Sequence, residues 1–461
     1  MSENLIKELL YQRYIEPTKK KREPCIGIEI EMPILNLDKN PVDFAVIHEI
    51  TENFMKKFDF HVLGEDEEGN IYSISEEIHG DILSYDCSYN NLELSLGKEK
   101  DLFQIWERFT NYYDYLQEQL GEYHYTLTGM GVNPYRIYNK NVPIPNGRYR
   151  MLFHHLKSYE NYHLPMYFHS HPEYGTFSSA SQVQLDVNHE DLIPTLRAFS
   201  RLEPIKALLF SNSVLLEEQE ELLCCRDMFW ENSTHGINPH NVGMFECELE
   251  NDEDLLAYIE STSIYCLERD GKYINFPPIR ILEYFQKSSV EGEYYEDGSY
   301  KKIQVKPELS DIQYLRTFKF EDLTFRGTIE FRSVCCQPIR DAMTVAAFHV
   351  GLKNRLYQLD ELLEKDHVIY HHGYNAAELR KMFNYRKLPS FVEEDALYEL
   401  VEEILNLARE GLEGRGLGEE IFLKPLYERV KERTNPARKM LELREKGTEL
   451  ERIILDYAAL R

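Results

Sequence analysis

Four short segments of the chain alternate apolar and polar residues, and each predicts a β-strand with one apolar and one polar face. They are residues 25–32, 91–96, 181–187 and 328–332. Their polar faces carry, in chain order, Glu29 and Glu31, Glu93, Gln184 and Asp186, and Glu330 and Arg332. One such segment alone is typical of an antiparallel strand with a wet face. Carboxylates are depleted in strands, however, so their recurrence here indicates a shared site.

A common sheet would bring these acids onto one concave surface. Glu29 and Glu31 would lie about 7 Å apart on one strand, with Glu93 and Glu330 on neighbouring strands. So many carboxylates ionise together only where cations neutralise them, and oxygen ligands without Cys or His select Mg²⁺ or Mn²⁺ over Zn²⁺. Arg332 would stand beside that site. Metal ions next to an arginine suit the transfer of a γ-phosphoryl group, so we expect ATP to bind, although no P-loop or protein-kinase motif is present.

Helical patterns fill much of the remaining chain. Helices are predicted for residues 1–19, 101–120, 192–209, 341–365, 394–410 and 436–460. Residues 285–312 are polar and contain glycine, which predicts an exposed hairpin or a mobile loop. We divide the chain into a catalytic domain, residues 1–380, and a helical C-terminal extension, residues 381–461, that packs on it.

The charge and the cysteines narrow the choice of partners and compartment. The 461 residues include 80 acidic and 52 basic ones, for a formal net charge of −28. Such a field disfavours nucleic acids and anionic membranes as partners. The eight cysteines have no zinc-binding spacing, and the amphipathic N-terminal segment has no signal-peptide core. No apolar run reaches the roughly 18 residues that span a bilayer. We therefore predict a cytoplasmic protein that acts on small molecules, with its oligomeric state left open.

Seven short motifs follow one another between about residue 24 and residue 340. They are IGIEIE (26–31), NLELS (91–95), PNGRY (145–149), SQVQLD (181–186), FSNS (210–213), CRDMFW (225–230) and GTIEFR (327–332). Each is weak alone, but in this order they resemble the glutamate–cysteine ligases of the plant and proteobacterial type. That family belongs to the glutamine synthetase-like carboxylate–amine ligases.

The resemblance implies an α+β fold in which a curved, mainly antiparallel sheet forms an active-site funnel, flanked by helices and followed by a helical C-terminal region. It assigns metal ligation to Glu29, Glu31, Glu93 and Glu330. It assigns the γ-phosphoryl group and the accepting carboxylate to Arg226 and Arg332. It assigns substrate or ATP binding to Gln184, Arg148, Asn188 and Trp230. Arg148 is equally well explained as a structural arginine beside Tyr149.

The implied reaction is ATP- and magnesium-dependent formation of an amide through an acyl phosphate, with the γ-carboxylate of glutamate and the amine of cysteine as expected substrates. Two departures leave the substrates open. Residues 231–236, which follow Trp230, lack the family's arginine, and residues 314–317 read YLRT instead of His-Leu-Thr-Thr.

Three alternative functions remain. The first is a ligase of a specialised biosynthetic pathway with another acid or amine. The second is an inactive binding homologue, which the retained glutamates and arginines argue against. The third is a metal-dependent hydrolase, which would require His or Asp ligands. Irregular spacing and a loop-like context favour surface or hydrogen-bonded roles over metal binding for His154, His155, His163, His169 and His171.

Overall fold

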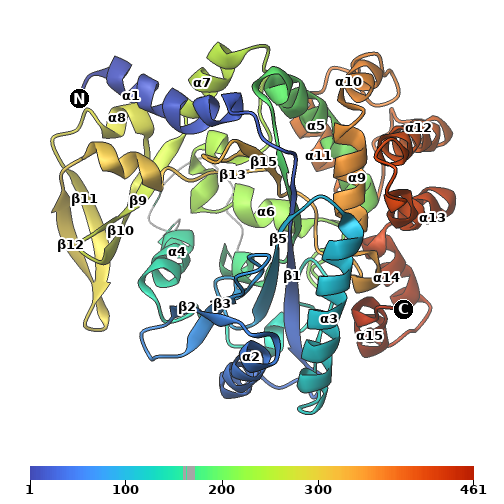
Figure 1. Cartoon of the computed structure of the whole chain (residues 1–461), viewed down its shortest axis with the longest axis horizontal. Helices are drawn as coiled ribbons and strands as arrows, with labels where there is room; N and C mark the ends of the chain where they lie inside the picture. The colour runs from blue at the N-terminus through green and yellow to red at the C-terminus, as the bar shows by residue number, and fades with distance from the viewer. Residues whose placement is uncertain (159–161, 163–171) are drawn as a thin grey trace.

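The computed structural model describes residues 1–158, 162 and 172–461, and its helices surround one large and one small antiparallel sheet (Figure 1). The large sheet has the strand order β14-β15-β7-β1-β5-β4-β3-β2, with β6 paired to β1. Its strands are β1 (Ile26–Asn36), β2 (His61–Glu65), β3 (Ile71–Ser75), β4 (Ile82–Tyr85), β5 (Asn91–Glu99), β6 (Tyr125–Leu127), β7 (Ser181–Asp186), β14 (Glu321–Leu323) and β15 (Thr328–Phe331). The predicted α+β class with a mainly antiparallel sheet is confirmed.

The four strands predicted from the sequence are neighbours at the centre of this sheet, in the order β15-β7-β1-β5. Their apolar faces are buried: Ile28, Ile30 and Met32 of β1 belong to the main hydrophobic core. The helix α3 (Leu102–Gly121) packs against β5, and α9 (Thr344–Lys353) packs against β7 and β1. The opposite face of the central strands is therefore left free for polar side chains.

The helices before residue 340 are α1 (Glu3–Leu10), α2 (Phe44–Phe58), α3, α4 (Gly147–Lys157), α5 (His189–Phe210), α6 (Cys225–Glu231), α7 (Asp252–Glu260) and α8 (Ile281–Tyr284). The predicted helices at residues 101–120 and 192–209 correspond to α3 and α5. The side chain of Asp101 accepts a hydrogen bond from the backbone N–H of Phe103 (2.8 Å). This N-cap explains why α3 begins where it does.

The small sheet has the order β12-β11-β10-β9 and lies at the end of the molecule that contains the N-terminus (Figure 1). Its strands are β9 (Ser263–Arg269), β10 (Lys272–Arg280), β11 (Val290–Glu296) and β12 (Ser299–Val305), and a separate parallel pair joins β8 (Val242–Gly243) to β13 (Phe318–Lys319). The hairpin predicted within residues 285–312 is formed by β11 and β12. Asp297 and Gly298 both have positive φ, as a two-residue hairpin turn of type I′ requires.

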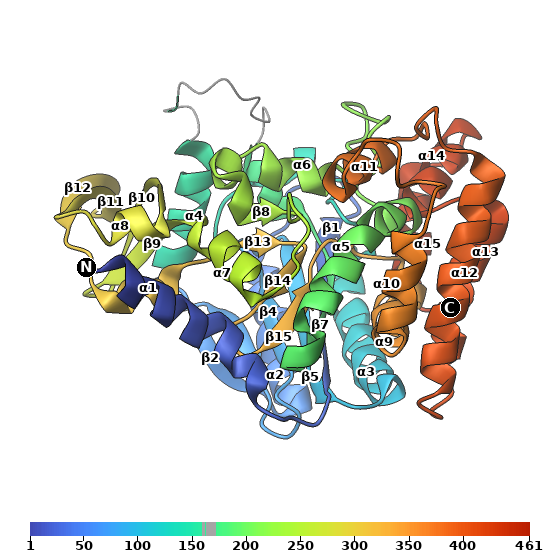
Figure 2. The same cartoon turned by 90° about the horizontal axis from the view of Figure 1, so that it is seen from above.

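The C-terminal helices lie at the other end of the molecule from the small sheet (Figure 2). They are α9, α10 (Leu356–Glu364), α11 (Ala376–Phe383), α12 (Glu394–Glu413), α13 (Lys424–Glu432), α14 (Pro436–Glu445) and α15 (Leu450–Ala458). A Cβ atom on Gly351 of α9 would lie 2.2 Å from the carbonyl oxygen of Ala408 on α12, so these two helices cross in backbone contact. None of the helices in the described ranges is long and apolar enough to cross a membrane.

Two predicted helices are each divided in the structure. Residues 341–365 form α9 and α10, separated at Asn354 and Arg355, and residues 436–460 form α14 and α15, separated at Gly447 with its positive φ. The predicted boundary after residue 380 falls inside α11. The division into a catalytic domain and an extension stays a prediction.

Candidate active site

The register of the central strands places the predicted acidic residues on one face of the large sheet. Residues that face each other across an antiparallel pair lie on the same side of the sheet. The facing pairs are Glu31 with Glu93, Glu29 with Gln182, and Glu330 with Gln184. The four glutamates of the sequence prediction thus share one sheet face.

Glu31 is buried and is held by β7 and the residue before it. Its Oε2 accepts a hydrogen bond from the backbone N–H of Ala180 (2.7 Å), and its Oε1 accepts one from the side-chain amide of Gln182 (2.7 Å). Burial and the charge of Asp86 raise the pKa of Glu31 to about 8. Gln182, which the sequence reasoning did not assign to the site, therefore positions Glu31 directly.

Neighbouring carboxyls on this face also hold their protons unusually tightly. Burial and then the charge of Asp86 raise the pKa of Glu93 to about 7, even though Glu93 accepts a hydrogen bond from the hydroxyl of Ser95 (2.7 Å). Burial, followed by the charges of Glu93 and Glu330, raises the pKa of Glu29 well above its usual value. The sheet face is consequently a cluster of carboxyls whose ionisation is disfavoured by burial and by the neighbouring negative charges.

The donor chemistry of this cluster fits a hard divalent cation, because the ligands offered are carboxylate and amide oxygens. The side-chain N–H of Gln184 is buried without a hydrogen-bond partner among the described residues. Within residues 1–158, 162 and 172–461, no three acidic, histidine or cysteine side chains are placed to hold one ion together. Metal ligation by the four glutamates therefore stays a prediction.

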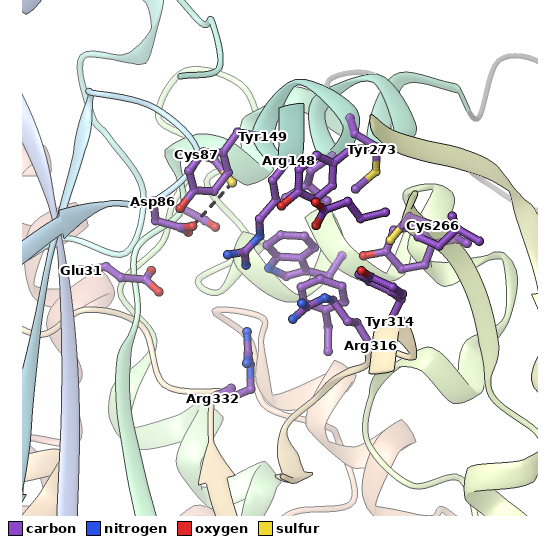
Figure 3. A pocket seen from close by; sticks show the side chains of 18 of the residues that line it. Glu31, Asp86, Cys87, Arg148, Tyr149, Cys266, Tyr273, Tyr314, Arg316 and Arg332 are labelled. Carbon is purple, nitrogen blue, oxygen red and sulfur yellow. Dashed lines mark hydrogen bonds between the residues drawn. The ribbon is translucent and has the colours of Figure 1, made fainter. Parts of the chain in front are cut away.

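A cavity of about 260 Å³ opens in front of this sheet face. Its wall is built from β1, the turn after β4, α4, α6, β9, β10 and the residues from 314 to 320. Five residues of the sequence prediction line it, namely Glu31, Arg148, Arg226, Trp230 and Arg332. Arg148, Arg316 and Arg332 direct their guanidinium groups into the same space, and Glu31 faces it from the sheet (Figure 3). The cavity thus combines one acidic wall with several arginines.

The two predicted catalytic arginines are linked to each other. Nη1 of Arg226 donates a hydrogen bond to the backbone carbonyl of Arg332 (2.8 Å), and Nη1 of Arg332 contacts Oε2 of Glu330 at 3.1 Å. Burial disfavours the charge of Arg332, but the carboxylates of Glu330 and Asp322 outweigh it and raise its pKa. Arg332 therefore stays a permanent cation at the edge of the acidic face.

Five of the predicted residues do not line the cavity, whereas Trp230 does. Glu29, Glu93, Gln184 and Glu330 are on the acidic sheet face but do not line the cavity in front of it. Asn188 is exposed at the N-cap of α5, away from the cavity lining, so its position does not support its predicted role in binding. Trp230 stacks on Phe318, with ring centroids 4.8 Å apart.

Sequence reasoning missed Asp86 and Arg316 as lining residues. Asp86 continues the alternation of β4 and follows Tyr85, so a strand pattern at residues 82–86 was a signal for it. Arg316 precedes the short strand β13 and reaches the cavity only through the tertiary fold.

Two histidines, His155 and His235, are buried behind aromatic residues of the cavity wall and are neutral. His155 stacks on Tyr265 (4.3 Å between centroids) and lies 5.0 Å from His235. Burial lowers the pKa of His235 to about 3 and that of His155 well below its usual value. His154 contacts Glu293 at 3.1 Å. The remaining members of the predicted group, His163, His169 and His171, lie outside the described residues.

The raised carboxyl pKa values predict how stability depends on pH. Glu31 and Glu93 keep their protons to about pH 8 and pH 7 in the folded protein, but the unfolded chain releases them near pH 4. The contribution of these two carboxyls to the free energy of unfolding of the metal-free protein should therefore fall as the pH rises from about 4 to 8. Urea unfolding in EDTA measures this slope. Relative to the unsubstituted protein, Glu93→Gln should lose less free energy of unfolding as the pH rises, whereas the exposed Glu107→Gln on α3 should leave the pH dependence unchanged. Equal slopes in both variants would contradict the assignment.

Known proteins resemble this chain over most of its length. The family model described as glutamate-cysteine ligase family 2 matches residues 25–456. The chloroplastic glutamate–cysteine ligase B of Oryza sativa subsp. japonica is 24% identical over 434 residues, covering 92% of this chain and 81% of the rice protein. The chloroplastic glutamate–cysteine ligase of Nicotiana tabacum is 25% identical over 436 residues, covering 92% of this chain and 76% of the tobacco protein.

A solved structure has the same fold. It is the glutamate–cysteine ligase of Francisella tularensis in complex with AMP, with a TM-score of 0.50 and 11% identity, covering 95% of this chain and 88% of that one. The resemblance drawn from the seven motifs is confirmed, and this chain belongs to the glutamate–cysteine ligase family 2.

Proposed function

We propose that this ligase uses Mg-ATP to join the γ-carboxylate of glutamate to the amine of cysteine through an acyl phosphate. The observation that carries the proposal is the pair Arg226 and Arg332, which face Glu31 across one cavity at the edge of the acidic sheet. The rice and tobacco relatives are glutamate–cysteine ligases, which supports the choice of substrates.

Glu29, Glu31, Glu93 and Glu330 would hold the magnesium ions that accompany ATP. Bound magnesium would neutralise charge on the phosphate oxygens during transfer. The sheet face fits this role because its carboxyls are clustered, and ionising all of them requires cations.

In the first step, one oxygen of the substrate carboxylate attacks the γ-phosphorus of ATP. A bond forms between that oxygen and phosphorus, the bond from phosphorus to the β-phosphate oxygen breaks, and ADP leaves. Two anions must approach each other, so fixed positive charge is needed where they meet. Arg332 stays charged and Arg226 is tied to its backbone, so both guanidinium groups are available at that point.

In the second step, the amine nitrogen attacks the acyl carbon. The bond from that carbon to the phosphate oxygen breaks, phosphate leaves, and the amine loses one proton. Water would destroy the acyl phosphate, so the site has to limit its access. The stacked rings of Trp230 and Phe318 form an apolar part of the cavity wall and serve this purpose.

A buried arginine from the C-terminal half holds both catalytic arginines in place. Arg380 on α11 donates through Nε to Asp227 (2.8 Å), the residue after Arg226, and through Nη2 to the carbonyl of Ser333 (3.3 Å), the residue after Arg332. Its guanidinium also lies 4.5 Å from the ring centroid of Phe320, which lines the cavity. Arg380 thus connects α11 to the two segments that carry the chemistry.

A second candidate is a ligase of the same mechanism with another acid or amine. It is favoured by the neutral His235, which is buried behind Phe318 of the cavity wall, and by Arg316, which lines the cavity where the family pattern has no arginine. The cytoplasmic location stays a prediction, since the plant relatives are described as chloroplastic.

The proposed chemistry predicts that ADP release requires Glu330 and Arg332. With Mg-ATP, glutamate and cysteine, we expect ADP and a product with the mass of γ-glutamylcysteine. Glu330→Gln and Arg332→Lys should each lower the rate about 100-fold or more, as for loss of one group that stabilises transition-state charge. The exposed hairpin variant Glu291→Gln serves as the control and should keep the rate. ADP release that depends on a different acid or amine would establish the second candidate. Full activity in both site variants would refute the proposed site.

The position of Arg380 predicts a loss of rate that stability alone does not explain. Arg380→Lys keeps the positive charge but loses the planar guanidinium that donates hydrogen bonds to both the Asp227 carboxylate and the Ser333 carbonyl. We expect kcat to fall at least tenfold. Arg429→Lys is a matched control, because Arg429 is similarly buried and bonds to the Leu209 carbonyl (3.0 Å) and to Asp341 (2.7 Å), away from the cavity. If both variants lose stability to the same degree and keep the same kcat, the positioning role of Arg380 is wrong.

A further inference from the structure

Two arginines of the cavity have no hydrogen-bond or ion-pair partner among the described residues, although the guanidinium of one of them, Arg148, lies 5.5 Å from the ring centroid of Tyr149. Arg148 lies in the first turn of α4, and Arg316 lies just before β13. Among the described residues, neither guanidinium donates a hydrogen bond or contacts a carboxylate, although each is exposed to the cavity that it lines. Arg332, in contrast, contacts Glu330, and Arg226 donates to a carbonyl.

The unpaired guanidinium groups point toward one another rather than out into solvent. Figure 3 shows Arg148 and Arg316 extending into the centre of the cavity from the side of α4 and β13, with Arg332 approaching from below. Like charges that converge in this way repel, and an anion between them removes the repulsion. Arginines without an acidic partner are unexpected in a chain with a formal net charge of −28, because acidic side chains are abundant there.

Arg316 also adds positive charge to its part of the wall, where Arg332 lies 5.7 Å from the ring centroid of Phe318. His235 lies 4.4 Å from Phe318 by ring centroids, and burial keeps it neutral by lowering its pKa to about 3. Residues 231–236, which contain His235, include no arginine or lysine. An anionic group of a substrate that reaches this wall therefore finds Arg316 from one side and Arg148 from the other.

We propose that Arg316, together with Arg148, binds the second carboxylate of the acid substrate, the one that is not phosphorylated. The proposal rests on the proposed function, which places the reacting carboxylate at Arg226 and Arg332. All four arginines line one cavity of about 260 Å³, so a single small acid with a carboxylate at each end can contact both pairs. Binding at two ends orients the reacting carboxylate, which is how a site selects a diacid over a monoacid.

Steady-state kinetics with paired substrates tests this assignment. Glutamate is compared with 4-aminobutyrate, which lacks the α-carboxylate, and cysteine is compared with cysteamine, which lacks the carboxylate of the amine substrate. Arg316→Gln should raise KM for glutamate at least tenfold with a smaller change in kcat. It should also reduce the preference for glutamate over 4-aminobutyrate by at least tenfold. Arg316→Lys should restore part of the preference, and Arg326→Gln, which removes an exposed charge outside the cavity, should change nothing.

Other outcomes overturn the inference. An unchanged preference between the two acids would show that Arg316 does not hold the second carboxylate. A change confined to KM for ATP would assign the pair to the nucleotide phosphates. A narrowed preference between cysteine and cysteamine alone would assign it to the amine substrate.

A binding measurement separates this inference from the proposed function. Isothermal titration with Mg²⁺ and a non-hydrolysable ATP analogue compares glutamate, aspartate, glutarate and 4-aminobutyrate. The unsubstituted protein should bind at least one diacid tenfold or more tightly than Arg316→Gln does, and both proteins should bind 4-aminobutyrate equally weakly. If no diacid binds better to the unsubstituted protein, the inference is wrong. If diacids bind as expected and no ADP is released, only the proposed function is wrong.

Discussion

Several carboxyl groups are buried side by side on one face of the central sheet, and the remainder of the site is arranged around that constraint. Burying one carboxylate already disfavours its charge, and each charged neighbour adds to the cost. Burial and the charge of Asp86 raise the pKa of Glu31 to about 8 and that of Glu93 to about 7. A sheet face of this kind is stable when its carboxyls are protonated or when cations are bound. The free-energy cost of burying these carboxyls is explained by a function in holding cations for a polyanionic substrate.

The positive groups at the edge of this face depend on a second, buried network. Arg226 and Arg332 are connected through a backbone carbonyl, and Arg380 binds the residue that follows each of them. Arg380 also binds Glu203 on α5, so the two arginines are fixed to the helical layer. Because α11 supplies this link, the C-terminal half contributes to the geometry of the site as well as to stability.

The sequence predicts the parts of the structure that short-range patterns control. The alternation in IGIEIE, NLELS, SQVQLD and GTIEFR locates the four central strands and assigns their acids to one face. The pattern does not reveal Arg316, because a residue before a two-residue strand has no periodicity to mark it and reaches the cavity through tertiary contacts. The glycine at position 447 indicates in the sequence that the helix ends between α14 and α15. The helix break at Asn354 and Arg355 has no glycine or proline to indicate it. Asn188 follows its motif in sequence, but at the N-cap of α5 it does not line the cavity.

We propose above all that the acidic sheet face binds divalent cations together with the nucleotide. Electron paramagnetic resonance of Mn²⁺, titrated into the protein with a non-hydrolysable ATP analogue, counts the ions bound. We expect at least one Mn²⁺ per chain beyond that bound by the nucleotide alone. Mg²⁺ should displace this ion, and its affinity should fall at least tenfold in Glu29→Gln. Equal Mn²⁺ binding by the unsubstituted protein and Glu29→Gln, or no binding beyond that of the nucleotide, would contradict it.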